Sequence, residues 1–162
     1  MLIRKATLMD LPVLWPLWLA LTSEECANEA TQGREMYPAV LLDDRDSWAL
    51  EYAMVLTNPN ACLLLAESSG EVVGFMLSSI NSRQVGHPKN YVHVHSLYVR
   101  PSERKRVGGT VAEQLQEEST KWALANGVTA IEIDCVLSNQ SRWAKQGFTP
   151  AAVRMYKTLE TK

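Results

Sequence analysis

The sequence has no apolar run close to the roughly 20 residues that a membrane-spanning helix needs. Its N-terminus, Met1-Leu2-Ile3-Arg4-Lys5, does not lead into the apolar core of a signal peptide. Cysteine is scarce: Cys26, Cys62 and Cys135 are odd in number, and none belongs to a Cys-x-x-Cys pair. This pattern indicates reduced thiols in an intracellular protein rather than a disulfide framework. We therefore expect a cytoplasmic protein that does not enter a membrane.

The chain also lacks a strong overall charge. Its formal net charge is −2, so nothing global suggests binding to nucleic acid. The charges are unevenly placed, however. Residues 22–46 carry seven acidic side chains and two basic ones, whereas residues 100–106 carry four basic side chains and one acidic one. The acidic stretch fits either a solvated helix face or a surface that attracts a cationic ligand, and both interpretations remain open.

The 162 residues fit one domain, residues 1–162, without a linker or an internal repeat. Alternation, helical periodicity and turn residues predict a mixed α/β fold. In chain order the expected elements are a strand at 2–6, a helix at 11–21, helix fragments and loop at 22–45, a helix at 46–56, strands at 61–67, 71–81 and 91–99, a helix at 108–126, a strand at 129–136, a short helix at 139–146 and a strand at 152–159.

A basic, glycine-containing loop joins one of these strands to a helix. It consists of Arg104, Lys105, Arg106, Val107, Gly108, Gly109 and Thr110. A loop in this position presents successive backbone N–H groups to an anion, and the helix dipole adds a favourable field. The glycines let the backbone approach a phosphate closely. The alternative is a turn that carries a solvated basic run.

The strand before this loop contains two histidines in the segment His93-Val94-His95-Ser96-Leu97-Tyr98-Val99. Alternation places His93 and His95 side by side on one face, together with Leu97 and Val99. An imidazole titrates near neutral pH, so either ring can take a proton from an amine, directly or through water. A His-x-His pair can also bind a metal, but no further ligand cluster accompanies it, so we expect none. Two histidines satisfied within the sheet are the structural alternative.

Together, this strand, Arg100-Pro101, the basic loop, the helix, the next strand, Asn139, the short helix and Gly147-Phe148 resemble the GNAT N-acetyltransferase superfamily. The resemblance covers residues 61–159 well and residues 1–60 by element order only. It implies a mostly antiparallel central sheet flanked by helices, and acetyl-CoA as the co-substrate. It also implies direct transfer of the acetyl group to a primary amine, such as a small cationic metabolite, an antibiotic or a peptide amine. Members of this superfamily are commonly dimeric.

The same resemblance assigns roles to individual residues. The backbone from Arg104 to Thr110 would hold the pyrophosphate of CoA. Leu97, Tyr98 and Val99 would contact the cofactor, with the main chain of Leu97 and Val99 pairing with its pantetheine arm, and Asn139 also falls in the cofactor set. The His-x-His-x-Leu-x-Val segment is similar to that of arylalkylamine N-acetyltransferases, where both histidines are implicated in deprotonating the amine.

Two positions depart from the family pattern. Val107 stands where the motif usually has its first glycine, and valine disfavours a positive φ and adds bulk near a phosphate. Trp143 stands where the family often has a catalytic tyrosine, and an indole N–H is a hydrogen-bond donor but not an acid at neutral pH. The general acid is therefore open: Tyr98 and Tyr156 are candidates by residue type, and water is another.

Overall fold

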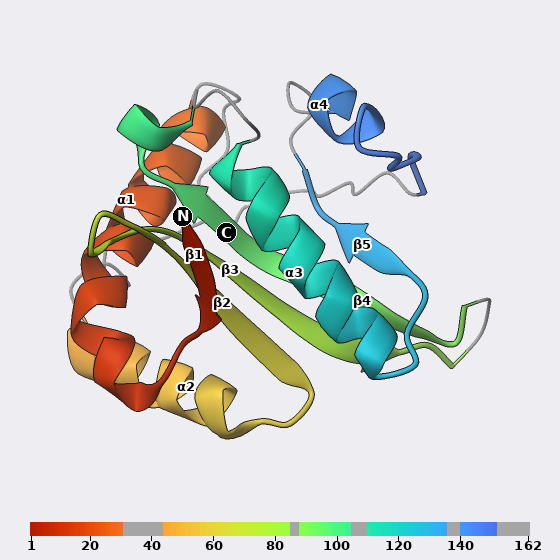
Figure 1. The fold of residues 1–162 in the computed structure, drawn as a ribbon, viewed down its shortest axis with the longest axis horizontal. Coiled ribbons are helices and arrows are strands. Elements are labelled where there is room, and N and C mark those ends of the chain that lie inside the picture. The colour runs from red at the N-terminus through yellow and green to blue at the C-terminus, as the bar shows by residue number, and fades with distance from the viewer. Residues whose placement is uncertain (31–43, 85–87, 105–109, 136–139, 152–162) are drawn as a thin grey trace, which may run out of the picture.

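Five strands form a single sheet in the order β1-β2-β3-β4-β5 (Figure 1). The structure is a computed structural model that describes residues 1–30, 44–84, 88–104, 110–135 and 140–151. The first four strands pair antiparallel, and β4 and β5 pair parallel. Their bounds are β1 Leu2–Lys5, β2 Ala61–Ser68, β3 Glu71–Ser82, β4 Asn90–Val99 and β5 Ile131–Ile133. This confirms the mixed α/β fold with a mostly antiparallel sheet.

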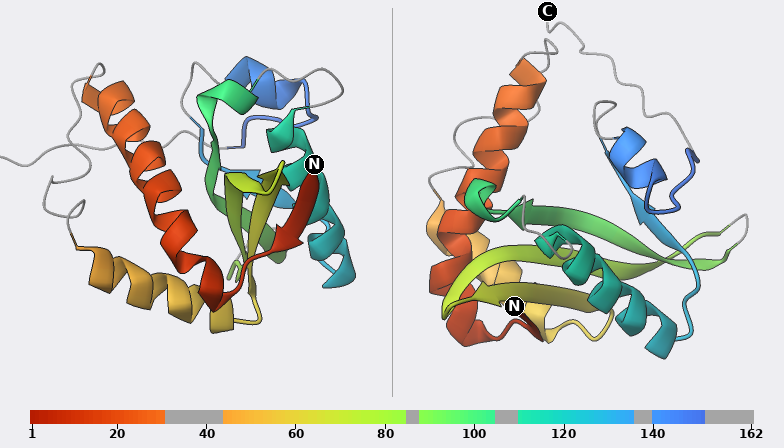
Figure 2. Two further views of the ribbon diagram at one scale, coloured as in Figure 1. Left: turned by 60° about the vertical axis from the view of Figure 1, so that its left-hand side comes forward. Right: turned by 45° about the horizontal axis from the view of Figure 1, so that its top comes forward.

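Helices cover the two faces of the sheet unequally. Helices α1 (Leu11–Ala30) and α2 (Arg45–Thr57) lie on one face, and α3 (Val111–Ala125) lies on the other (Figure 2). The first core cluster joins Leu14, Leu17 and Trp48 to β2, β3 and β4. The second joins Val111 and Leu115 of α3 to the opposite sides of the same strands. Because both faces are covered there, β2 and the first half of β3 are almost continuously buried.

The turn between β2 and β3 follows directly from its residues. Ser69 and Gly70 both have positive φ, 53° and 83°, which is the backbone of a tight two-residue hairpin turn. Glycine adopts this conformation without steric cost, so Gly70 is well suited to the second position. The hairpin that the sequence predicts at Ser68-Ser69-Gly70 is confirmed.

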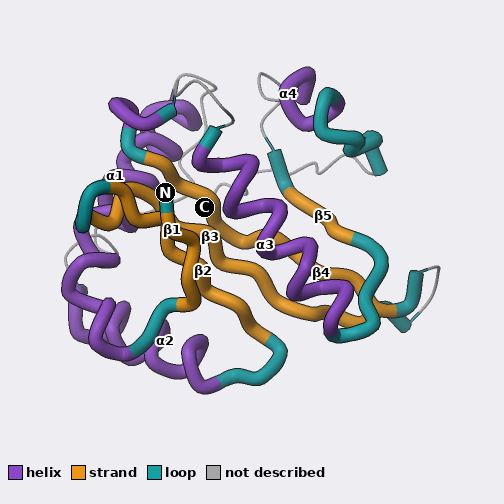
Figure 3. Tube along the Cα trace, viewed as in Figure 1, coloured by secondary structure: helices purple, strands orange, loops and turns teal. Residues whose placement is uncertain are grey.

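Several element boundaries differ from those expected. Helix α1 continues to Ala30, nine residues beyond the predicted end at Leu21, within a stretch expected to be broken. The cap of α2 is Asp44, whose carboxylate accepts a hydrogen bond from the Ser47 N–H at 2.9 Å, and not Asp46. The secondary structure traced in Figure 3 shows β5 as a short strand, shorter than the predicted 129–136. The strand predicted at 152–159 lies outside the described residues.

Helix α4 (Gln140–Ala144) follows β5 and lies beyond the free end of that strand (Figure 1). Its Trp143 ring meets the Phe148 ring edge to face at 5.3 Å between centroids. Gly147, with φ of 87°, separates the helix from Phe148. No helix in the described part of the chain combines the length and apolar character needed to cross a membrane.

Candidate active site on strand β4

A β-bulge interrupts β4 at His95. Leu77 of β3 pairs with Ser96, but the next residue, Ser78, pairs with Val94, so His95 is an extra residue in β4. The bulge changes the alternation of side chains. Leu97 and Val99 pack with Val94 in the cluster under α3. The prediction that Leu97 and Val99 share the histidines' face is therefore wrong, because strict alternation does not hold across an inserted residue.

The two histidine rings do lie side by side, as the sequence predicts. Their centroids are 4.7 Å apart and their planes are inclined by 70°. The Nε2 atom of His95 lies 2.6 Å from the Ser79 hydroxyl oxygen, which also accepts a hydrogen bond from the Asn81 side-chain amide at 3.2 Å. The Nε2 atom of His93 lies 3.9 Å from Oδ2 of Asp134. Each ring therefore has a different polar partner.

The face that holds the histidines is polar from β3 to β5. Ile131 and Ile133 pack toward α3, and alternation then places Glu132 and Asp134 on the histidines' side of the sheet. Glu132 pairs with Arg83, whose guanidinium lies 4.3 Å from the centre of the Tyr91 ring. This polar face adjoins the apolar area beneath α1 and α2 in the same sheet.

Burial and the neighbouring His93 both lower the pKa of His95. Desolvation, and then the nearby His93, lower the pKa of His95, while the negative charge of Asp134 acts in the opposite direction. A lowered pKa keeps the His95 ring neutral at neutral pH. The short distance between the rings means that a proton on His93 disfavours protonation of His95.

Strand β4 has an unpaired edge next to the bulge. Strand β5 reaches only to Ile133, opposite Val94, and within the described residues no strand pairs with the rest of β4 on that side. The Arg100 N–H donates to the Val73 carbonyl of β3. Because successive residues of a strand point their main-chain groups to opposite sides, Leu97 and Val99 point theirs to the open edge. This placement fits the pantetheine role that the resemblance implies, which stays a prediction.

Arg104, the first residue of the basic loop, is held by residues of two elements, α1 and β4. Its Nη2 atom lies 2.7 and 2.8 Å from the two carboxylate oxygens of Glu24 on α1, and its Nε donates to the Val99 carbonyl at 2.8 Å. Its guanidinium carbon lies 5.6 Å from the centre of the Tyr98 ring. The side chain thus ties α1 to the end of β4 at the start of the loop.

Thr110, at the other end of the loop, caps α3. Its N–H donates to Oε2 of Glu113 at 2.7 Å, and its hydroxyl accepts from the Glu113 N–H at 3.2 Å. This capping box engages the Thr110 donor within the chain. The remaining predicted phosphate-binding residues, Lys105, Arg106, Val107, Gly108 and Gly109, lie outside the described residues, as do Asn139 and Tyr156.

Tyr98 lies near Arg104 and Glu24. Its side chain is buried in the cluster beneath α1, near the Phe75 ring at 6.3 Å. Burial, with the nearby Glu24 carboxylate, raises the pKa of its phenol. The bulge accounts for this placement, because it puts Tyr98 on the α1 side of the sheet instead of the α3 side. Tyr98 thus packs in the core, and its candidacy as the general acid stays a prediction.

The sequence reasoning missed Ser79, Asn81 and Asp134. A signal for the first two exists, since they are polar residues two apart in an otherwise apolar strand. Asp134 alternates with Ile133 and Ile131 in the same way. No group of three or more histidine, cysteine or acidic side chains that could hold a metal ion occurs among the residues described.

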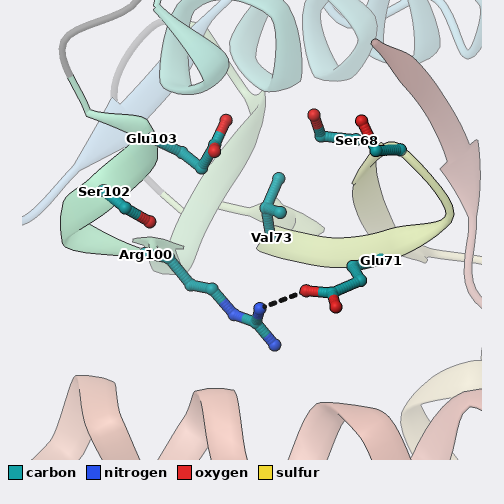
Figure 4. A pocket seen from close by; sticks show the side chains of 7 residues that line it. Ser68, Glu71, Val73, Arg100, Ser102 and Glu103 are labelled. Carbon is teal, nitrogen blue, oxygen red and sulfur yellow. Dashed lines mark hydrogen bonds and ion pairs between the residues drawn. The ribbon is translucent and has the colours of Figure 1, made fainter.

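A separate polar hollow lies near the β2–β3 turn (Figure 4). It is bordered by the ion pair between Arg100 and Glu71, 2.9 Å long. The Glu71 end of β3 is eight residues from Ser79, or roughly 25 Å at the usual rise of a strand. The hollow is therefore distinct from the histidine site and lies beside the residues that lead into the basic loop.

The sequence matches the acetyltransferase (GNAT) family over residues 19–148. The chain belongs to this family. It is accordingly an acyltransferase that uses acetyl-CoA as its acetyl donor, as the sequence analysis expects. No curated protein is significantly similar to it in sequence.

Solved structures show the same GNAT fold at low sequence identity. A mutant of the BH1408 protein from Bacillus halodurans has 15% identity and a TM-score of 0.78, with 99% of this chain and 100% of that chain covered. The aminoglycoside 6'-N-acetyltransferase AAC(6')-IG from Acinetobacter haemolyticus has 23% identity and a TM-score of 0.70, with both chains fully covered at 100%. A predicted acetyltransferase from Clostridium acetobutylicum, crystallised with acetyl-CoA, has 14% identity and a TM-score of 0.72 over 97% of this chain and 95% of its own.

Proposed function

We propose that this protein transfers the acetyl group of acetyl-CoA directly to a primary amine, and that His93 and His95 handle the proton of that amine. The observation that carries the proposal is the histidine pair at the bulge, next to the open edge of β4. An amine bound on the polar face would meet a thioester bound along that edge at the bulge. The two reactants would then be held together, which is the largest requirement of a direct transfer.

The chemistry requires the amine to lose a proton. An aliphatic ammonium has no lone pair, so a ring nitrogen of the histidine pair takes its proton first. Acetyl-CoA supplies a thioester carbon that accepts the amine, with a C–N bond formed and the C–S bond broken. Bulge N–H groups on the open edge of β4 would stabilise the oxyanion of this step. The departing thiolate is protonated by water or by a group outside the described residues.

The acceptor classes that we propose are a small cationic metabolite, an aminoglycoside-like antibiotic and a peptide N-terminus. The polar face supports a cationic acceptor, since Asp134 and Glu132 lie on it with the histidines. We also expect the protein to be cytoplasmic and to form a homodimer, which light scattering on the purified protein would test.

The decisive experiment is an amine panel. The purified protein is incubated with acetyl-CoA and one amine of each class, and the release of free thiol is measured against a blank without amine. We expect release with at least one class. His93→Gln and His95→Gln should lower kcat at neutral pH by roughly 10²-fold in the more affected variant, with unchanged CoA affinity. Wild-type rates in both variants would remove the histidines from the mechanism.

A matched variant separates binding from turnover. Gly109→Glu places a carboxylate in the proposed phosphate loop and should abolish the stabilisation by CoA, which is about 2.7 kcal/mol at 100 times the dissociation constant. Binding of CoA by the wild type without turnover on any amine would favour the alternative, a non-catalytic acyl-CoA-binding domain. Two departures from the family pattern favour this alternative: Val107 in place of the usual glycine and Trp143 in place of the usual tyrosine.

A further inference from the structure

The two histidines differ in what holds them, and this difference suggests a division of labour. We propose that Asp134 is a positioning residue that makes His93 the base for the amine, while Ser79, held by Asn81, keeps His95 an uncharged neighbour throughout the reaction. This inference rests on the proposed function and deepens it, since it assigns the proton to one ring. It also assigns roles to three residues that the family resemblance did not mark.

The His93 ring lies near a carboxylate. Oδ2 of Asp134 lies 3.9 Å from Nε2 of His93, within the reach of an ion pair. A carboxylate on one ring nitrogen stabilises the imidazolium and leaves the opposite nitrogen, Nδ1, to accept a proton. The Asp134 side chain is 57% exposed, so its role is electrostatic rather than one of core packing.

The His95 ring has a neutral partner. Its Nε2 faces the Ser79 hydroxyl at 2.6 Å, and that oxygen already accepts from the Asn81 amide. With one lone pair used by Asn81, the hydroxyl is free to donate its hydrogen to the ring nitrogen. A hydroxyl stabilises an imidazolium far less than a carboxylate does. The lowered pKa of His95, caused by burial and by His93, acts in the same direction.

The other charged and titratable groups around the pair do not compete with Asp134 for this role. From β5, Glu132 is paired with Arg83, the residue that follows β3, and Arg83 also covers the Tyr91 ring of β4. From α2, Tyr52 approaches β4 through a hydrogen bond with Ser96, and burial raises the pKa of its phenol, so that it stays neutral. Asp134 is thus the carboxylate placed on the His93 ring.

The first test is the pH dependence of kcat. Asp134→Asn removes the carboxylate beside the His93 ring, so the acid limb of the profile should move to lower pH. The plateau should fall roughly tenfold, because the base is weaker. Asp134→Glu should restore part of both. Glu117→Gln, which removes a carboxylate from the opposite face of the molecule, should change neither.

Two further variants separate the rings. His93→Gln should lower kcat at least tenfold more than His95→Gln. Ser79→Ala should reduce the plateau without moving the acid limb, because His95 does not take up the proton. A larger loss in His95→Gln, or an acid limb that moves with Ser79→Ala, would overturn the assignment of the base to His93.

The second test needs no turnover. The ring protons of the histidines are titrated by NMR in the wild type, in Asp134→Asn and in Glu117→Gln, with His93→Gln and His95→Gln for assignment. In Asp134→Asn the pKa of His95 should fall further, because a charge that raises it is removed. Glu117→Gln should leave it in place. If no amine is acetylated, the proposed function fails while this titration still tests the placement of Asp134. If turnover is found but neither the acid limb nor the titration responds to Asp134→Asn, the inference is wrong and the function stands.

Discussion

Two buried serines join β3 to α3, and their removal gives a quantitative test of the packing behind the active site. The hydroxyl oxygens of Ser78 and Ser119 are 3.1 Å apart, and the two residues are 1% and 0% exposed. Ser78 pairs with Val94, directly beside the bulge. Ser119→Ala leaves the Ser78 hydroxyl buried without this partner, which costs about 1–3 kcal/mol. The double variant should cost less than the sum of the two single variants, since it removes both polar groups together.

The measurement is a double-mutant cycle by urea denaturation, supported by calorimetry. For a chain of this length, each kcal/mol lost from the free energy of unfolding lowers Tm by roughly 3 °C. Each single variant should therefore melt about 3–9 °C below the wild type, and the coupling free energy should be about 1 kcal/mol or more. Strictly additive single and double variants would refute the reasoning, because each hydroxyl would then have another partner, such as a carbonyl of its own element.

Two more variants test other parts of the fold. Gly74→Ala should destabilise the protein by about 1–3 kcal/mol, because a Cβ there would lie 2.7 Å from the Tyr98 carbonyl oxygen and the strand would have to shift. Urea denaturation measures this loss. Unchanged stability would mean that β3 and β4 separate easily. Asp10, buried and bonded to Arg4 and Thr7, has a pKa far below its usual value because of the Arg4 hydrogen bonds. The ionised Asp10 contributes to the free energy of unfolding above about pH 4, and this contribution is lost as the pH falls below that value. The wild type should therefore be more stable than Asp10→Asn by about 2 kcal/mol at pH 7. This difference, measured by denaturation, should shrink from pH 5 to pH 2.

The order of the elements could be read from the sequence because local signals mark them. The hairpin at Ser69-Gly70 is formed by two residues that adopt a positive φ. Gly127, with φ of 71°, directly follows the predicted end of the helix at 126. The sequence predicts too short a helix α1, because the second half of this helix has weak hydrophobic periodicity. It buries Leu21 and Thr22 and pairs Glu24 with the basic loop, contacts made with residues far away in the chain.

Only part of the site can be predicted from the sequence, because the rest also depends on contacts between residues far apart in the chain. The two histidines can be recognised from their residue type and spacing. Their rings are expected side by side because residues two apart in a strand lie on the same face. The bulge has no signature in β4 itself, since it depends on the register with β3. Ser79 and Asp134 reach the histidines from neighbouring strands, and such cross-strand neighbours become visible only when the pairing of the sheet is known.

The open edge of β4 has a consequence for the protein without its co-substrate. Beyond the end of β5, the main-chain groups of Leu97 and the N–H of Val99 face away from β3, whereas the Val99 carbonyl is bonded to Arg104. An unpaired strand edge is a template for association with another chain. A pantetheine arm bound there would cover that edge as an added strand would. Acetyl-CoA is then expected to act as a protective ligand as well as a donor, so that concentrated protein stays in solution longer with CoA than without it.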